Sequence, residues 1–164
     1  MLRSPEEALR LAEDLRTEIA AVAQTVVDGN SVLAKTGAGV PDRLTVYAAA
    51  AILHSFYTGI EKVLLHVAPA LNGGAPQQRS WHRQLLEQMS RPLPGVRPAV
   101  LSEDAARALD SYLGFRHRFR NAYGFELDWA KIRALLERLD ETWKFVENDL
   151  RAFEIFVRSI ATPD

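Results

Sequence analysis

Residues 115–129, FRHRFRNAYGFELDW, gather into one short stretch the residue types that handle phosphate groups. Three arginines and a histidine fall within Phe115–Arg120, and an asparagine, a tyrosine and a glycine follow. Arginine presents a planar fork of N–H donors that matches phosphate oxygens and stays charged near neutral pH. Histidine is the side chain best suited to move a proton in that range. The stretch is therefore a candidate site for a polyanion, with a solvated helix end as the alternative.

An imidazole close to a guanidinium has the chemistry to cleave RNA without a metal ion. The imidazole helps the ribose 2′-hydroxyl attack the adjacent phosphodiester, and the guanidinium neutralises the charge that develops on phosphorus. At about 100° per helical residue, Arg116, Arg120 and Tyr123 fall on the border of the buried face. His117 and Asn121 share the next strip of the helix. The spacing predicts a graded edge between the core and water.

The region around this stretch is basic, although the chain as a whole has a net charge of only −1. Residues 79–120 contain eight arginines and two histidines against four acids, whereas residues 1–30 contain six acids and three bases. A local concentration of positive charge can attract phosphates where the net charge does not. The alternative is that these arginines only solvate two helices.

Length and composition limit the class of protein. A chain of 164 residues with 48% hydrophobic and 25% charged residues is expected to form one domain over residues 1–164. No apolar run approaches the roughly 18 residues of a membrane span, and the charged start MLRSPEEALRLAEDLR lacks the apolar core of a signal peptide. The absence of cysteine excludes disulfides and thiolate metal sites, and it fits a cytoplasmic protein.

Apolar residues at helical spacing predict an all-α protein, an antiparallel up-and-down bundle of about five helices. Ser4 and Pro5 are the expected N-cap and first position of the first helix, which DGNSVLAKTGAGV (residues 28–40) should end. Its apolar positions are Leu9, Ala12, Leu15, Ile19, Val22 and Val26. The second helix is expected from Pro41 to about Ala68, and the third within QQRSWHRQLLEQMS, stopped by the prolines that follow.

The fourth and fifth helices must position the three arginines of residues 115–120. Ser102 is the expected N-cap of the fourth helix and Gly124 its terminator. The fifth helix has an apolar seam with alternating spacings of three and four residues. The seam consists of Trp129, Ile132, Leu136, Leu139, Trp143, Val146, Leu150, Phe153, Val157 and Ile160. We expect it to lie mainly in the core of the chain, with contact to a second chain as the alternative.

The apolar second helix carries polar side chains that need partners. Glu61 follows His54 by seven residues, with Tyr57 or Thr58 between them on the same face. Because an isolated buried carboxylate is costly, Glu61 is expected to contact an arginine of residues 115–120, either to position it or as a structural ion pair. No third ligand accompanies His54 and Glu61, so no metal site is expected. His82, in the basic third helix, is a candidate RNA contact, with helix capping as the alternative.

The stretch 115–129 resembles the signature of HEPN-domain ribonucleases. In that signature an arginine and a polar residue precede three variable residues, a histidine, one further residue and a tyrosine. The corresponding positions here hold Arg116, His117, Arg118, Phe119, Arg120, Asn121, Ala122 and Tyr123. LHSFYTGIEKVL (residues 53–64) and SWHRQLLEQM (residues 80–89) resemble the HepT-like branch of the superfamily. The resemblance covers residues 40–155.

The resemblance implies a toxin of a type VII (HEPN/MNT) toxin–antitoxin pair: an all-helical homodimer that acts as a metal-independent RNA endonuclease without a cofactor. It implies an MNT-type nucleotidyltransferase antitoxin as partner, which would AMPylate Tyr123. The catalytic candidates are Arg116, His117, Asn121 and Tyr123. The candidate RNA contacts are Arg116, Arg120 and His82. Glu61 would support the site.

One position departs from the family pattern. Where the signature has its catalytic histidine the chain has Asn121, and an amide cannot act as a general base. Either His117 supplies the imidazole from one turn away, or the protein is a catalytically weak binding module that acts through a partner or a nucleotide. A helical interaction protein with solubilising arginines is a third alternative. A homodimer with both copies of Arg116 facing a shared groove would supply the longer positive surface that RNA needs.

Overall fold

The computed structural model describes residues 4–77, 80–121 and 127–162, and the regular structure in these ranges is helical. The five helices are α1 Pro5–Lys35, α2 Arg43–Leu71, α3 Trp81–Met89, α4 Glu103–Asn121 and α5 Trp129–Ala161. No β-strand occurs within the described ranges. The predicted all-α bundle of about five helices is confirmed.

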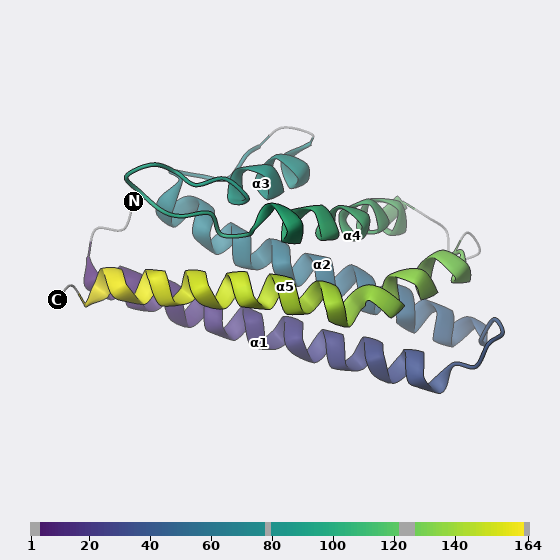
Figure 1. The fold of residues 1–164 in the computed structure, drawn as a ribbon. Helices are drawn as coiled ribbons and strands as arrows, with labels where there is room; N and C mark the ends of the chain where they lie inside the picture. The colour runs from purple at the N-terminus through teal and green to yellow at the C-terminus, as the bar shows by residue number, and fades with distance from the viewer. Residues whose placement is uncertain (1–3, 78–79, 122–126, 163–164) are drawn as a thin grey trace.

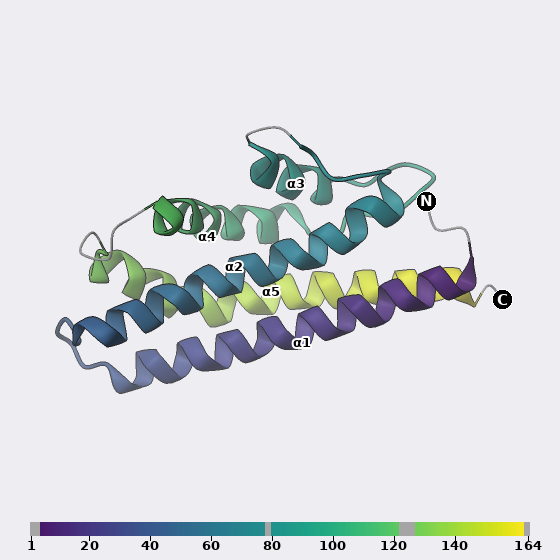
Figure 2. The same cartoon turned by 180° about the vertical axis from the view of Figure 1, so that it is seen from behind.

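The four longer helices run alternately up and down the bundle, and the short α3 lies over one side of it (Figure 1). α1 packs along both α2 and α5, and α4 packs against α2 and α5. α3 contacts α2 and α4 and lies beside them in both views (Figures 1 and 2). The side of the bundle formed by these three helices therefore carries the basic segment of the sequence.

The first helix is longer than predicted. It continues through the expected break at residues 28–40 as far as Lys35, with Thr36 as its C-cap. Gly29 does not end it, because this residue lies against α5: a Cβ built there would come within 2.5 Å of a methyl carbon of Leu139. Val32 and Leu33 then pack against the core. Tertiary packing thus overrides a local breaker signal.

The apolar seams are mostly buried as predicted, with one exception at each end of the chain. Leu9 is exposed, and its neighbours Ala8 and Leu11 face the core in its place. Ile160 at the end of the α5 seam is also exposed, whereas the rest of that seam is buried within this chain. The α5 seam is therefore core.

Polar contacts fix how α4 lies on its neighbours. Ser102 accepts a hydrogen bond from the backbone of Ala105, as an N-cap does, and Ser102 itself donates through N and Oγ to Asp149 of α5 at 2.8 and 2.7 Å. The buried hydroxyl of Tyr112 donates to the backbone oxygen of Leu135 at 2.9 Å. These contacts hold α4 in one rotational position, which sets the direction of its arginines. The predicted terminator Gly124 lies outside the described residues.

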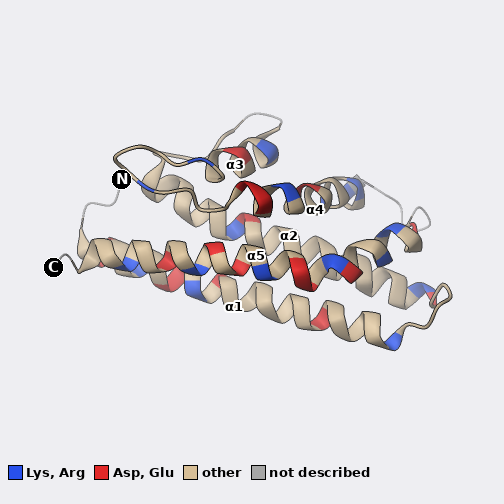
Figure 3. Ribbon diagram, viewed as in Figure 1, with Lys and Arg blue, Asp and Glu red and all other residues tan. Residues whose placement is uncertain are grey.

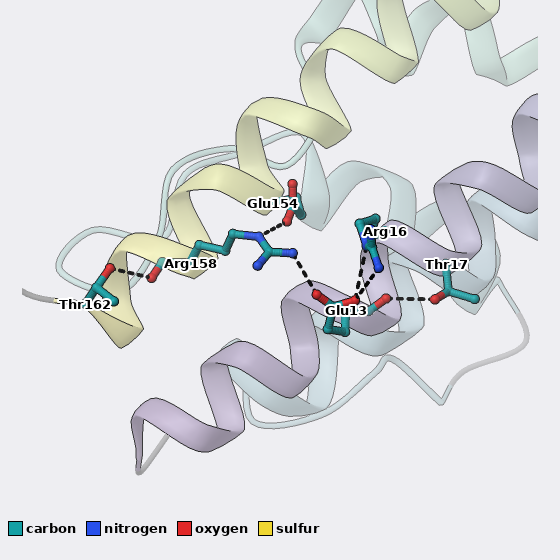
Figure 4. A network of polar contacts seen from close by, with 6 residues as sticks. All are labelled: Glu13, Arg16, Thr17, Glu154, Arg158 and Thr162. Atoms are coloured by element: carbon teal, nitrogen blue, oxygen red, sulfur yellow. Dashed lines mark hydrogen bonds and ion pairs between the residues drawn. The ribbon is translucent and has the colours of Figure 1, made fainter.

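Surface ion pairs join α1 to α5 near the chain termini. Arg158 contacts Glu13 at 2.9 Å and also pairs with Glu154, and Glu13 pairs with Arg16 (Figure 4). Glu13 and Arg16 are exposed and Arg158 is partly exposed, so solvent screens the pair that joins the two helices and it contributes little to stability. Acidic and basic residues alternate along α5, whereas α4 changes from an acidic first turn to a basic last turn (Figure 3). None of the described helices is long and apolar enough to cross a membrane.

Candidate active site

Three polar side chains from three helices meet inside the bundle. Glu61 of α2 forms an ion pair with Arg116 of α4, in which Oε1 of the carboxylate and Nη2 of the guanidinium are 3.2 Å apart. The other carboxylate oxygen, Oε2, lies 2.5 Å from Nδ1 of His82 in α3. Nε2 of the same imidazole lies 3.3 Å from Nη1 of Arg116. Each of these groups therefore contacts both of the others.

The contact between Glu61 and Arg116 confirms the prediction that Glu61 pairs with an arginine of residues 115–120. Arg116, however, does not lie at the edge of the bundle: its residue is only 7% exposed and Glu61 only 4%. The spacing of residues along α4 shows which face of α4 Arg116 occupies. It does not show that the neighbouring helix α2 carries a carboxylate opposite that face. Because Glu61 compensates its charge, the guanidinium can lie inside the protein at the level of the core.

The surroundings of the cluster hold its members in place. The ring of Trp81 lies against that of His82, with the centroids 3.6 Å apart. Burial and the Glu61 carboxylate raise the pKa of Tyr57 far above its ordinary range, so this phenol stays neutral. Arg83 pairs with Asp110 and ties α3 to α4. His82 is thus fixed from its own helix and from both neighbouring helices.

The contacts assign the tautomer of His82. A guanidinium has only donors, so Nε2, which faces Arg116, must be the acceptor. Nδ1 then carries the proton and donates to the carboxylate of Glu61. In this tautomer the lone pair on Nε2 of His82 is directed at the buried cation Arg116.

The cluster opens onto a cavity of about 470 Å³. Its polar lining consists of Ser80, His82, Arg83, Arg116, His117 and Arg118. Leu113 and Gly114 complete it. The cavity thus brings two imidazoles and three guanidiniums together, a lining suited to a phosphate diester with an adjoining sugar and base.

The remaining predicted residues lie apart from this cluster or beyond the described ranges. Arg120 is exposed near the end of α4, and His117 is exposed on the rim of the cavity. Asn121 is the last residue of α4, and its side chain is not described. Tyr123 lies outside the described residues.

His54 does not line this cavity and instead lines a separate hollow between α1 and α2. Its ring is 5.3 Å from that of Phe119. Burial lowers the pKa of His54, and the positive charges of Arg116 and Arg120 lower it further, against a smaller opposing effect of Glu61. No group of three or more His, Asp or Glu side chains among the described residues is arranged to hold a metal ion.

The pair of Glu61 and His82 is the feature that sequence reasoning missed. The two residues are separated by 21 positions and lie in different helices, so no periodic pattern links them. Two signals were available separately: a carboxylate on an apolar helix that needed a partner, and a histidine beside a tryptophan in a basic helix. Only the packing of α3 on α2 joins them.

The fold and the site define an all-helical bundle protein with an arginine–histidine–glutamate cluster between three of its helices. A sequence-family model described as HepT-like protein matches residues 48–157, well over half of the chain, and this range contains the whole cluster. The chain therefore belongs to the HepT-like family of the HEPN superfamily. No curated protein and no solved structure matches it significantly.

Proposed function

We propose that the protein is a HepT-like toxin that cleaves RNA without a metal ion, with the cavity between α3 and α4 as its active site. The observation that supports this most strongly is the meeting of Arg116, His82 and His117 at one cavity in a chain of this family. These are the groups that phosphodiester cleavage through the ribose 2′-hydroxyl needs. A nuclease or toxin kind of function is typical of the family.

The chemistry follows from those groups. A guanidinium contacts the phosphate and stabilises the charge of the pentacoordinate transition state. A neutral imidazole takes the proton of the 2′-hydroxyl as its oxygen bonds to phosphorus. The bond from phosphorus to the 5′-oxygen breaks, and that oxygen takes up a proton. The products are a 2′,3′-cyclic phosphate and a 5′-hydroxyl end.

The experiment is incubation of the purified protein with RNA in excess EDTA, followed by analysis of the new ends. We expect fragments ending in a 2′,3′-cyclic phosphate. As a control for surface charge, Arg107→Ala should cleave as the wild type does, because this exposed arginine lies on α4 outside the cavity and pairs with its neighbour Asp104. RNA that stays intact with the wild-type protein would contradict the proposal.

A catalytically weak binding module is the second candidate function. The observation that favours it is Asn121, which replaces the signature histidine, together with an arginine already neutralised by Glu61. The two functions differ in one measurement. Filter binding with retention of intact RNA in EDTA would indicate the binding module, and release of cyclic-phosphate fragments would indicate the ribonuclease.

We propose an MNT-type nucleotidyltransferase as the antitoxin, with Tyr123 as the modified residue. A nucleotide on Tyr123 would add negative charge to the arginine-rich end of α4 and compete with RNA. Intact-mass spectrometry after co-expression should show one added nucleotide monophosphate on the wild type and none on Tyr123→Phe. An inhibited but unmodified toxin would mean that the partner works by occlusion.

We also propose a homodimer in which the two cavities face one groove. Near the cavity, the last turn of α4 exposes only two arginines in one copy, Arg118 and Arg120, and RNA needs a longer track of positive charge. A two-fold axis beside α4 would double this charge. Light scattering at micromolar concentration should give twice the chain mass of 18.3 kDa. A monomer would contradict this part of the proposal.

A further inference from the structure

The imidazole of His82 is held by a buried carboxylate on one side and faces a cation on the other. Glu61 fixes Nδ1 at 2.5 Å, and Nε2 is directed toward Arg116 at 3.3 Å. This arrangement orients a ring, sets its tautomer and places its lone pair beside the group best suited to bind a phosphate. Nothing in the signature of the family assigns a role to this pair.

We propose that Nε2 of His82 is the general base that takes the proton of the ribose 2′-hydroxyl, with Glu61 as its positioning residue. This deepens the ribonuclease activity proposed above and rests on it. His82 would thus fill the role left open by Asn121. His117, which lines the same cavity, is the competing candidate.

Distance supports this assignment. The 2′-hydroxyl of a ribose lies next to the phosphodiester that it attacks, so the base and the phosphate-binding group must be close neighbours. Nε2 of His82 and Nη1 of Arg116 are 3.3 Å apart and both residues line the cavity. When Arg116 binds a phosphodiester of RNA, the 2′-hydroxyl of the adjoining ribose therefore comes within reach of His82.

Charge supports it as well. When Nε2 takes a proton, His82 becomes a cation between Arg116 and Glu61. The carboxylate of Glu61, buried and 2.5 Å from Nδ1, stabilises that cation and offsets the repulsion from the guanidinium. Without Glu61, a partly buried imidazolium beside Arg116 would be strongly disfavoured.

When RNA binds, a phosphate oxygen accepts the hydrogen bond that Nη1 of Arg116 donates to Nε2 of His82 in the free protein. The lone pair on Nε2 is then free to take a proton. The 2′-hydroxyl proton moves to Nε2, the 2′-oxygen bonds to phosphorus, and the bond from phosphorus to the 5′-oxygen breaks. The 5′-oxygen takes a proton from water at the open side of the cavity, and His82 later returns its proton to solvent.

The alternative is a purely structural role, in which Glu61, His82 and Arg116 form an ion network that ties α2, α3 and α4 together. Loss of stability in variants fits both explanations, so the test needs a readout that only a base would move. The variants are His82→Asn, which can still donate to Glu61, and the matched change His117→Asn on the rim. Both are compared with the wild type in single-turnover cleavage of RNA in EDTA, after circular dichroism has shown a native helix content.

We expect His82→Asn to lose about 10²–10⁴-fold in rate, and added imidazole to restore part of it in a concentration-dependent way. His117→Asn should lose less and should not respond to imidazole. Glu61→Gln should shift the acidic limb of the pH–rate profile to lower pH, because the imidazolium loses its carboxylate. A folded His82→Asn protein that cleaves at the wild-type rate would overturn the inference and leave the proposed function intact.

A measurement on the wild-type protein covers the case in which these variants do not fold. In ¹⁵N NMR, His82 should be neutral and protonated on Nδ1, and its Nε2 signal should shift when uridine 3′-monophosphate is added. An Nε2 signal that stays unchanged while the ligand shifts the signals of His117 would overturn the inference. A wild-type protein that cleaves no RNA would overturn both this inference and the function on which it rests.

Discussion

The guanidinium of Arg116 is buried but compensated, and this decides what it can do. Its two terminal nitrogens contact Glu61 and His82, while Nε lies buried without a hydrogen-bond partner in the described structure. A cation held in a fixed position by a carboxylate needs little reorganisation when negative charge develops beside it. The unpaired Nε–H has a cost, which a small movement of the group toward a bound phosphate could relieve.

Arg116→Lys tests the need for the planar fork. Lysine keeps the positive charge near Glu61, but its single ammonium cannot reproduce the spacing with which Arg116 contacts both Glu61 and His82. We expect RNA cleavage to fall by about 10²-fold or more, with the helix content retained. Initial rates measure this, with Arg107→Lys as the control on the exposed side of α4. Equal rates for Arg116→Lys and wild type would mean that charge alone is sufficient.

His54 should make the stability of the protein depend on pH. Its pKa is lowered in the folded state, chiefly by burial and further by Arg116 and Arg120. As the pH falls below about 6.5, the unfolded chain takes up the proton first. The free energy of unfolding therefore decreases as the pH falls from neutral through the folded pKa of His54, and this contribution is fully present only above about pH 6.5.

Urea unfolding at pH 7.5 and pH 5.5 checks this expectation. His54→Gln should lose less stability between the two values than the wild type does, because the variant has no imidazole to protonate. The difference between the two proteins removes the contribution of the other titrating groups. An identical loss in both proteins would contradict the assignment.

At the scale of elements, the position of α3 decides whether the cavity exists. Arg97, in the segment after α3, is 5% exposed and anchors this part of the chain. It donates to the backbone oxygens of Gln88, Arg91 and Pro98 and to the side chain of Asn72, the C-cap of α2, at distances between 2.8 and 3.1 Å. The C-terminal end of α3 is thereby fixed to the end of α2.

Arg97→Met should destabilise the protein by about 3 kcal/mol, because it leaves these acceptors without their charged donor. Chemical denaturation measures the loss. Arg91→Met is the matched control: its side chain is exposed, and a change there should stay within about 0.5 kcal/mol. Similar values for the two variants would show that the buried guanidinium does not anchor α3.

At Gly59, α2 packs closely against α1. A Cβ built there would lie 2.6 Å from Cγ2 of Val22, which is β-branched and buried. We expect Gly59→Ala to destabilise by about 1–3 kcal/mol, although alanine is the better helix former. In a Val22→Ala background the same change should be neutral or stabilising. Additive effects in this double-mutant cycle would contradict the steric explanation.

The sequence predicted some elements well for a physical reason. The seam of α5 repeats its spacing over the whole helix, so its buried face could be read from the periodicity, apart from Ile160 at the frayed end. The length of α1 could not be predicted in this way. Glycine normally breaks a helix, and only the contact of Gly29 with Leu139 of α5 explains why α1 continues. The burial of Arg116 and its contact with His82 depend on side chains from other helices, which no local pattern encodes.

For the whole molecule, the near-neutral charge conceals a local contrast. The net charge is −1, yet three arginines and two histidines line one cavity on the side formed by α3 and α4. The carboxylate of Glu61 lies behind this lining and not in it. Association with an anionic chain should therefore depend on this face alone, and weaken as salt screens it.

The central claim is that this cavity activates the ribose 2′-hydroxyl of RNA, and the substrate itself tests it most directly. The wild-type protein is incubated in EDTA with one RNA sequence in two forms, unmodified and fully 2′-O-methylated, and the fragments are counted. The account predicts cleavage of the unmodified strand to 2′,3′-cyclic phosphate ends and no cleavage of the methylated strand. Cleavage of the methylated strand at a comparable rate would contradict it.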